Sequence, residues 1–98
     1  MIATFYTSSP GPTASGQRFN PRAYTCAAPY GYRLGDVLLV SRGGRRVRVT
    51  VTDRGRLGHG HLDLTPAPFR ALAGRHWRKV GVVRGLHCRL VRRGHRRS

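Results

Sequence analysis

The side chains best suited to acid–base chemistry lie in one short stretch, residues 50–65. The chain has three carboxylate side chains, and two of them, Asp53 and Asp63, lie ten positions apart in this stretch, with His59 and His61 among glycines between them. Paired carboxylates suit general acid–base chemistry, in which one group delivers a proton and the other removes one. The alternative interpretation is structural, with Asp53 starting a turn and Asp63 capping the helix that follows.

Short strands are the elements that would position these residues. Alternating valines predict a half-buried strand over 45–53, and an apolar run predicts a strand buried on both faces over 36–42, with a hairpin turn between them. Further strands are expected over 3–7, 23–28, 62–64 and 80–91, with an ordered loop over 13–21 and a connector over 76–79. A helix is expected from Thr65–Pro66 to Gly74. About six short strands and one or two short helices predict a small, mainly β, closed barrel.

The length and the charge limit the choice of function. At 98 residues, we expect one domain over 1–92 and a basic, disordered tail over 93–98. The formal net charge of +16, carried almost wholly by arginine, predicts attraction to a polyanion such as nucleic acid or an anionic cell-wall polymer. A G+C-rich genome would also raise the arginine content. The sequence contains no run apolar enough to span a membrane, and its start has no signal-peptide pattern.

The two cysteines, Cys26 and Cys88, are 62 positions apart, which is not the spacing of a metal motif. A disulfide between them would join the two ends of a small exported domain and stabilise it by about 3–4 kcal/mol. The alternative is a pair of buried free thiols. We predict the disulfide.

Several segments, taken together and in order, resemble the rare lipoprotein A-like double-psi β-barrel family. The three segments that carry the resemblance are 13–21 (TASGQRFNP), 53–55 (DRG) and 62–65 (LDLT). The opening strand, residues 3–6, and the hairpin that begins at 35–37 also fit the family. The resemblance covers about residues 3–92.

The resemblance implies a six-stranded double-psi barrel with an open groove across one face. It also implies peptidoglycan as substrate, because members studied as enzymes are lytic transglycosylases that cleave the MurNAc–GlcNAc β-1,4 bond and leave a 1,6-anhydro-muramic end. An extracytoplasmic location follows, in the periplasm, in the cell wall, secreted or on a phage. We expect a monomer that needs no cofactor.

A lytic transglycosylase needs only one acid/base group, because the C6 hydroxyl of the substrate is the nucleophile. We assign that role to Asp53, and we assign substrate positioning or electrostatic support to Asp63. Asp53 must then be protonated near neutral pH, which partial burial favours and the neighbouring Arg54 opposes.

The predicted substrate-binding residues are of three kinds. Aromatic rings can stack on sugar rings, hydroxyl and amide groups can bond N-acetyl groups, and basic side chains can assist Asp53. These residues are Tyr6, Ser15, Gln17, Phe19, Asn20, Tyr30, Arg54, His59 and His61. The aromatic residues could instead belong to the core, and the polar ones could bond within their loop. His59, His61 and Asp63 could hold a metal with a fourth ligand, but the surrounding glycines favour a loop, so no metal is expected.

Three departures from the family leave other functions open. Family enzymes often have a Glu at Gln17, an Asp at Asn20 and a His near 28–29. The alternative is therefore a non-catalytic, expansin-like module that binds or loosens cell-wall polysaccharide. A third possibility, a nucleic-acid binder, is not favoured, because the arginines are dispersed and no RNP-like, zinc-finger or helix-turn-helix pattern is present.

Overall fold

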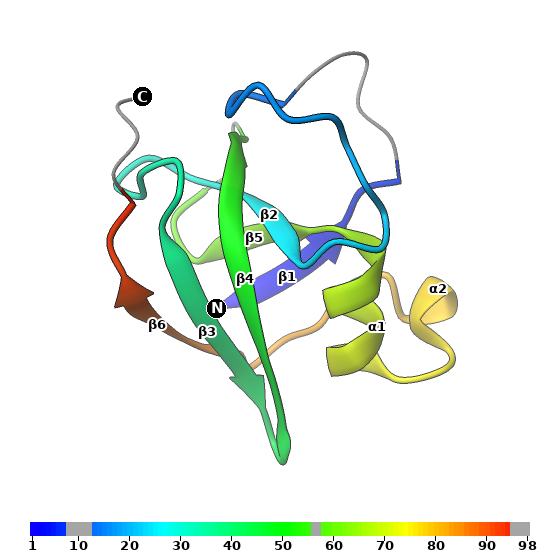
Figure 1. Ribbon diagram of the computed structural model, residues 1–98. Coiled ribbons are helices and arrows are strands. Elements are labelled where there is room, and N and C mark those ends of the chain that lie inside the picture. Colours follow the sequence, from blue (N-terminus) through cyan, green and yellow to red (C-terminus); the bar gives the residue numbers. More distant parts are fainter. Residues whose placement is uncertain (8–12, 56–57, 95–98) are drawn as a thin grey trace.

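The computed structural model of the chain describes residues 1–7, 13–55 and 58–94. Within these residues, six strands and two short helices form a curled half-barrel (Figure 1). In chain order the elements are β1 Ile2–Phe5, β2 Thr25–Ala28, β3 Val37–Arg42, β4 Arg45–Arg54, β5 His61–Leu64, α1 Pro66–Ala73, α2 Trp77–Val80 and β6 His87–Arg92. The predicted mainly β fold with six strands is confirmed. Neither helix is long and apolar enough to cross a membrane.

The strands form one sheet in the order β1-β5-β2-β4-β3-β6. The pairs β1–β5 and β2–β4 are parallel, and the other neighbours are antiparallel. Near the open edge, Ala3 of β1 exchanges two backbone hydrogen bonds of 2.9 Å with Val83, just before β6. The sheet therefore curls until its two edges approach each other. The central strand β2 lies between β4 and β5.

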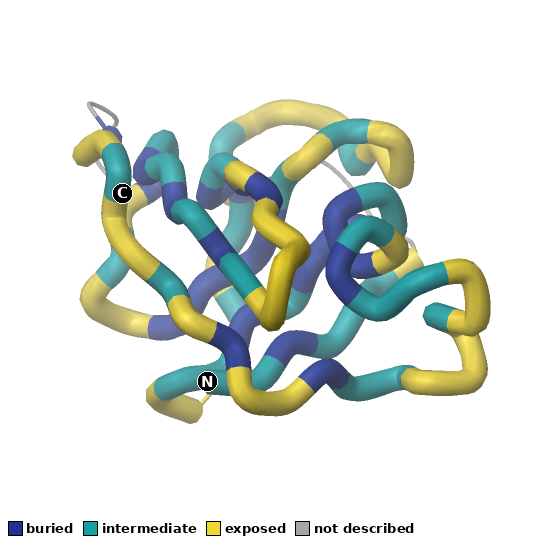
Figure 2. The backbone as a smooth tube through the Cα atoms, turned by 90° about the horizontal axis from the view of Figure 1, so that it is seen from below, coloured by how far each residue is buried: buried dark blue, intermediate teal, exposed yellow. Residues whose placement is uncertain are grey.

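The core fills the inside of this curl. The valines of β4 at 47, 49 and 51 are buried, whereas Arg46 and Arg48, which alternate with them, are exposed, as the alternation predicts. Phe69 and Leu72 of α1 are fully buried and extend the core. Figure 2 shows the buried segments gathered in the interior and the exposed ones around it.

Strand β3 does not have the two buried faces that the sequence predicted. Leu38 and Val40 are buried, but Val37 and Leu39 are only partly covered. The helix α1 packs against β1, β4 and β5. The outer face of β3 thus keeps contact with solvent.

Helix α1 begins and ends as predicted, but the Thr65 side chain does not cap it. Pro66 follows Thr65 at the start of the helix, and Gly74 ends it with a φ of 95°. The Thr65 side chain makes no capping bond. Instead, its hydroxyl oxygen lies 2.6 Å from the carbonyl of Ala23 and 2.9 Å from that of Thr25, and it accepts from the Thr25 N–H at 3.2 Å. Thr65 therefore ties the start of α1 to β2.

The domain extends past its predicted boundary at residue 92. The fully buried Asp36 carboxylate accepts hydrogen bonds from the Arg93 guanidinium at 2.8 Å and from the Gly94 N–H at 2.6 Å. A side chain at Gly94 would collide with the backbone at Leu34 and Asp36. Arg93 and Gly94 are therefore fixed, which corrects the prediction of a disordered tail for these two residues. Residues 95–98 lie outside the described residues.

The predicted disulfide is not present. Cys26 is a buried free thiol on β2, and Cys88 is a partly buried free thiol on β6. Burial raises the pKa of both thiols, and each lies close enough to the core to pack as an apolar residue. The alternative of two free thiols is the one observed.

Candidate functional site

The two carboxylates that the sequence singled out flank one residue, Ala27 of β2. Ala27 pairs with Asp53 of β4 on one side and with Asp63 of β5 on the other. The Cα atoms of the two aspartates are thus two strand spacings apart, roughly 10 Å. A bulge between Cys26 and Ala27 sets this register. Residues ten positions apart in sequence are thereby brought to one row across the sheet.

Asp63 is held by a hydrogen-bonded chain that starts at a histidine. The Thr4 hydroxyl donates to Asp63 Oδ1 at 2.9 Å and lies 2.8 Å from His61 Nε2. Because this hydroxyl has a single proton, His61 must donate to Thr4. Burial raises the pKa of Asp63 above its usual range, although the Thr4 hydrogen bond and His61 oppose the rise. Asp63 is not a helix cap, since its side chain bonds to β1.

Asp53 is held by backbone groups. Its Oδ1 accepts hydrogen bonds from the N–H of Ala14 at 3.0 Å and from the N–H of Arg54 at 2.9 Å. The first of these bonds joins the loop over 13–21 to the end of β4. Among the described residues, the Arg54 guanidinium forms no ion pair with Asp53. The carboxyl group is therefore oriented by the chain and not by a neighbouring cation.

A hollow of about 210 Å³ lies on one side of Asp53, between the loop and the sheet. Its wall includes the rings of Tyr6 and Phe19, whose centroids are 5.0 Å apart. The Tyr6 hydroxyl is shielded from solvent and lies near the Thr52 hydroxyl, but among the described residues it makes no hydrogen bond of good geometry. Burial, followed by the charge of Asp53, raises the pKa of Tyr6 to about 12, so the phenol keeps its proton. An unpaired buried donor in a hollow is suited to a polar ligand.

A second hollow, of about 320 Å³, lies on the other side of Asp53. Thr52 lines the first hollow and Arg54 lines the second, so Asp53 lies between the two along β4. Tyr30 borders the second hollow with 89% of its surface exposed. An aromatic ring so exposed is suited to stacking on a ligand ring.

The remaining loop residues that the sequence singled out also lie near the first hollow. Gln17 and Asn20 line it. The Ser15 hydroxyl lies 3.0 Å from that of Thr13 and accepts from the Gln17 N–H at 3.4 Å, and Asn20 Oδ1 accepts from the Arg22 N–H at 2.9 Å. These bonds order the loop, as the structural interpretation expected, while Gln17 stays exposed towards solvent.

Two carboxylates in one row of the sheet, with an aromatic-walled hollow and an exposed tyrosine near Asp53, form an arrangement that can contact sugar rings and transfer protons. Residues 1–86 match the family described as lytic transglycolase. The chain belongs to this family. As a lytic transglycolase domain it has the double-psi β-barrel fold that the resemblance implied.

Relatives of this lytic transglycolase domain carry several functional names. The chain is 40% identical over 79 residues to a probable endolytic peptidoglycan transglycosylase RlpA from Nostoc sp., an alignment that covers 72% of this chain and 21% of the relative. The chain thus spans about a fifth of that relative. The Streptomyces papain inhibitor superposes with a TM-score of 0.77 and 29% identity, over 93% of this chain and 91% of the inhibitor. A mutant Clavibacter michiganensis expansin in complex with cellohexaose superposes with a TM-score of 0.69 and 27% identity, over 93% of this chain and 48% of the expansin.

His59 and His61, the two histidines that the sequence singled out, lie in different surroundings. His61 is hydrogen-bonded to Thr4 and through it to Asp63, whereas His59 is exposed. Among the described residues, no group of three or more His, Cys, Asp or Glu side chains is placed to hold a metal ion. His61 is therefore better placed as a partner of Asp63 than of Asp53.

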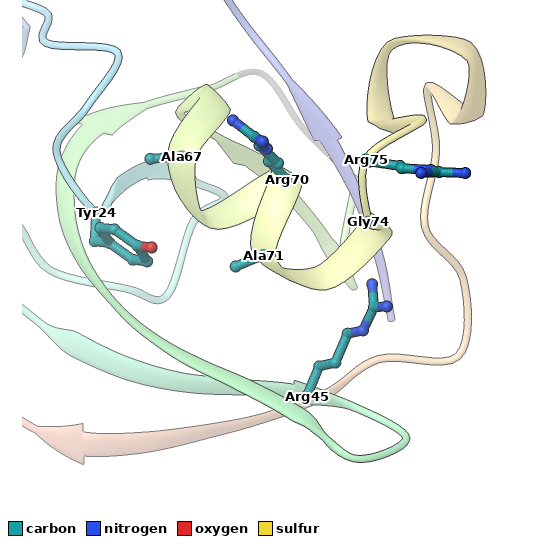
Figure 3. Close-up of a pocket in the computed structure, with 7 residues that line it drawn as sticks. All are labelled: Tyr24, Arg45, Ala67, Arg70, Ala71, Gly74 and Arg75. Carbon is teal, nitrogen blue, oxygen red and sulfur yellow. The ribbon is translucent and has the colours of Figure 1, made fainter.

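A wider hollow, of about 540 Å³, lies away from the carboxylates, between α1 and the start of β4 (Figure 3). Ala67 and Ala71 of α1 face Tyr24 across it, and the Arg45 side chain reaches towards Gly74 at the helix end. Arg45 Nη1 donates to the Leu72 carbonyl at 3.4 Å, which satisfies a free carbonyl of the last turn. Among the described residues, no carboxyl or imidazole group lines this hollow, so Asp53 and Asp63 stay the candidate site.

Sequence reasoning missed Thr4, which orients Asp63. The signal was present, because Thr4 and Tyr6 alternate on the first strand and so share a face. The pairing of β1 with β5, which places Thr4 opposite Asp63, is between strands far apart in sequence and could not be inferred from alternation alone.

Proposed function

We propose that this domain cleaves the MurNAc–GlcNAc β-1,4 bond of peptidoglycan as a lytic transglycosylase and leaves a 1,6-anhydro-muramic end. The observation that carries the proposal is the pair Asp53 and Asp63, placed on either side of Ala27. The 40% identity to a probable endolytic peptidoglycan transglycosylase supports the choice of substrate. The partner is then a cell-wall polysaccharide, and the site of action is extracytoplasmic.

The surroundings of the two carboxylates favour exchanging the roles that the sequence assigned. A general acid must hold a proton near working pH, and burial raises the pKa of Asp63 in that direction. In our proposal, Asp63 protonates the glycosidic oxygen as the C1–O4 bond breaks. The resulting carboxylate then takes the proton of the MurNAc C6 hydroxyl as its oxygen bonds to C1. One carboxyl group thus completes the reaction, and its proton is restored.

Asp53 supports this reaction by its charge. The transition state for glycosidic cleavage carries positive charge at C1 and the ring oxygen. A carboxylate fixed by the backbone N–H groups of Ala14 and Arg54 stabilises that charge without having to reorient. The hollows beside it hold neighbouring sugars, against Tyr6 and Phe19 on one side and Tyr30 on the other.

Two observations favour other candidates. The glutamine at 17, the asparagine at 20 and the alanine and proline at 28–29 replace residues that family enzymes often use, which favours an expansin-like module that binds or loosens wall polysaccharide. The likeness to the Streptomyces papain inhibitor covers nearly all of both chains, which favours protease inhibition. Assays of wall binding and of papain activity separate these candidates from the enzyme.

The test is mass spectrometry of purified peptidoglycan after incubation with the protein and with two matched variants, Asp63→Asn and Asp53→Asn. We expect anhydro-muropeptides from the wild type, none from Asp63→Asn, and a reduced amount from Asp53→Asn. An active Asp63→Asn beside an inactive Asp53→Asn would return the acid/base role to Asp53. Products with reducing ends would indicate a hydrolase. Sedimentation with the wall without any product would leave the expansin-like function.

A further inference from the structure

The outer face of β4, β3 and β6 has a strong positive charge that the proposed reaction does not use. Arg46 and Arg48 lie on β4, Arg89 and Arg92 lie on β6, and all four side chains are exposed. We call these four residues the arginine face. Figure 1 shows the three strands side by side, with β3 between the other two.

The strand register arranges the arginine face in rows. Leu39 of β3 pairs with Arg48 on one side and with Arg89 on the other. Val37 pairs with Arg92, and Ser41 pairs with Arg46. Two basic columns therefore run along a central column formed by β3. Successive rows are about 7 Å apart, and the columns are roughly 10 Å apart.

The arginine face has no internal neutralisation. Within the part of the chain that the structure describes, the single ion pair joins Arg93 to Asp36, and no hydrogen bond from the four guanidinium groups is recorded. Asp36 is buried, and the other two carboxylates lie in the candidate site. Like charges held this close repel one another, so an anion placed between the columns lowers the electrostatic energy.

The central column indicates which polyanion fits. Val37, Leu39 and Ser41 offer aliphatic and hydroxyl surface but no aromatic ring. Proteins that bind single-stranded nucleic acid stack the bases on aromatic side chains, and this face provides none. A polyol-phosphate chain needs no stacking. Its phosphates pair with guanidinium groups through two parallel hydrogen bonds, and its C–H groups contact the aliphatic side chains.

We propose that the arginine face binds a linear polyol-phosphate polymer, with the chain lying along β3 between the two arginine columns. On β4, Thr50 is the next outward residue after Arg48, and Thr52 beyond it lines the first hollow. Because Thr52 is itself buried, the exposed side of β4 ends near Thr50, at the edge of this hollow. This binding does not require cleavage of a glycan.

The test measures binding of the full chain to purified poly(glycerol phosphate) by titration calorimetry at several salt concentrations. The variant Arg48→Gln/Arg89→Gln removes the central row, and Arg75→Gln/Arg84→Gln is the control, with the same change in charge at exposed positions outside the face. We expect the first variant to bind about tenfold more weakly and the slope of log K against log salt to fall by about one to two, with little change in the control.

Three results would overturn the proposal. Equal losses in both variants would mean that only the net charge matters. No binding of the wild type at moderate salt would exclude the site. Tighter binding of an oligothymidylate of equal charge, lost in the same variant, would assign the face to nucleic acid. If the arginine variant is unstable, NMR chemical-shift changes of the wild type on addition of the polymer serve as the test instead. These changes must fall on residues 37–41, 46–50 and 87–92.

Discussion

The Thr4 hydroxyl donates its one proton to Asp63 at 2.9 Å, so it must accept one from His61 at 2.8 Å. This chain fixes the orientation of Asp63 and opposes the rise in its pKa that burial causes. The second Asp63 oxygen is then the one that can face a substrate. The geometry makes Thr4 a positioning residue, because it acts on the substrate only through Asp63.

Replacing Thr4 with valine keeps the shape and removes the hydrogen bond. A hydrogen bond to a charged group contributes about 1.5–3 kcal/mol, so we expect the rate of anhydro-muropeptide release to fall by about tenfold or more. Without this hydrogen bond, the pKa of Asp63 should rise further. Asp63 then keeps its proton to a higher pH, so the alkaline limit of activity should shift to a higher pH. The control is Thr50→Val on the outer face of β4. An unchanged pH profile would contradict the role of Thr4.

Replacing Asp63 with asparagine should stabilise the fold at neutral pH. The folded-state pKa of Asp63 is raised, so between the unfolded value of about 3.9 and the folded value the unfolded chain releases its proton first. The wild type therefore loses stability as the pH rises through this window, and asparagine does not. The measurement is urea unfolding of both proteins at pH 3 and pH 7. The midpoint of the variant minus that of the wild type should be larger at pH 7 than at pH 3.

Replacing Asp36 with asparagine should have the opposite effect on stability at neutral pH, because the pKa of Asp36 is lowered and not raised. Burial alone would raise the pKa of Asp36, but hydrogen bonds from the Arg33 and Gly94 N–H groups and from Arg93 outweigh it and hold the pKa below its usual range. The stability that Asp36 contributes is present above about pH 4 and is lost as the pH falls. A variant of Asp36 should therefore be most destabilised at neutral pH. If the stabilities of the Asp36→Asn and Asp63→Asn variants changed with pH in the same way, the opposite pKa shifts of the two aspartates would be contradicted.

The local patterns gave most of the fold, because strands, hairpin turn and helix ends depend on neighbours in sequence. The alternation of Val47, Val49 and Val51 placed β4 correctly. The burial of β3 was misjudged because it depends on where α1 packs, which is a long-range property. The disulfide was wrong because a spacing of 62 residues contains no information on how close the two sulfur atoms come.

For the candidate site, the sequence could single out residues but could not show how they are connected. Asp53 and Asp63 were found by their rarity, and the structure places them in one row. The roles that we propose for the two aspartates depend on the burial of Asp63 and on its hydrogen bond from Thr4. The parallel pairing of β1 with β5 places Thr4 beside Asp63. Gly94 was assigned to a tail because basic, glycine-containing ends resemble disordered segments, whereas its contact with Asp36 depends on the tertiary fold.

A chain that ends at Arg92 should be much less stable than one that ends at Gly94. The shorter chain loses two donors to the buried Asp36, the Arg93 guanidinium and the Gly94 N–H. Leaving a buried charge without its partner costs about 3–5 kcal/mol, a large part of the stability of a domain this size. Thermal unfolding of both truncated chains and of the full chain checks this. Equal midpoints would show that Asp36 finds other partners.

Removing the Tyr6 hydroxyl separates a role in binding from a role in stability. Among the described residues this buried hydroxyl makes no hydrogen bond of good geometry and only lies near Thr52, so Tyr6→Phe should leave the free energy of unfolding nearly unchanged. If the hydroxyl bonds a sugar in the first hollow, the variant should raise KM for peptidoglycan about three- to tenfold, the effect of losing one neutral hydrogen bond. Tyr30→Phe, in the second hollow, is the matched control, because the exposed Tyr30 contributes its ring face. A drop in stability with unchanged KM would make Tyr6 a core residue alone.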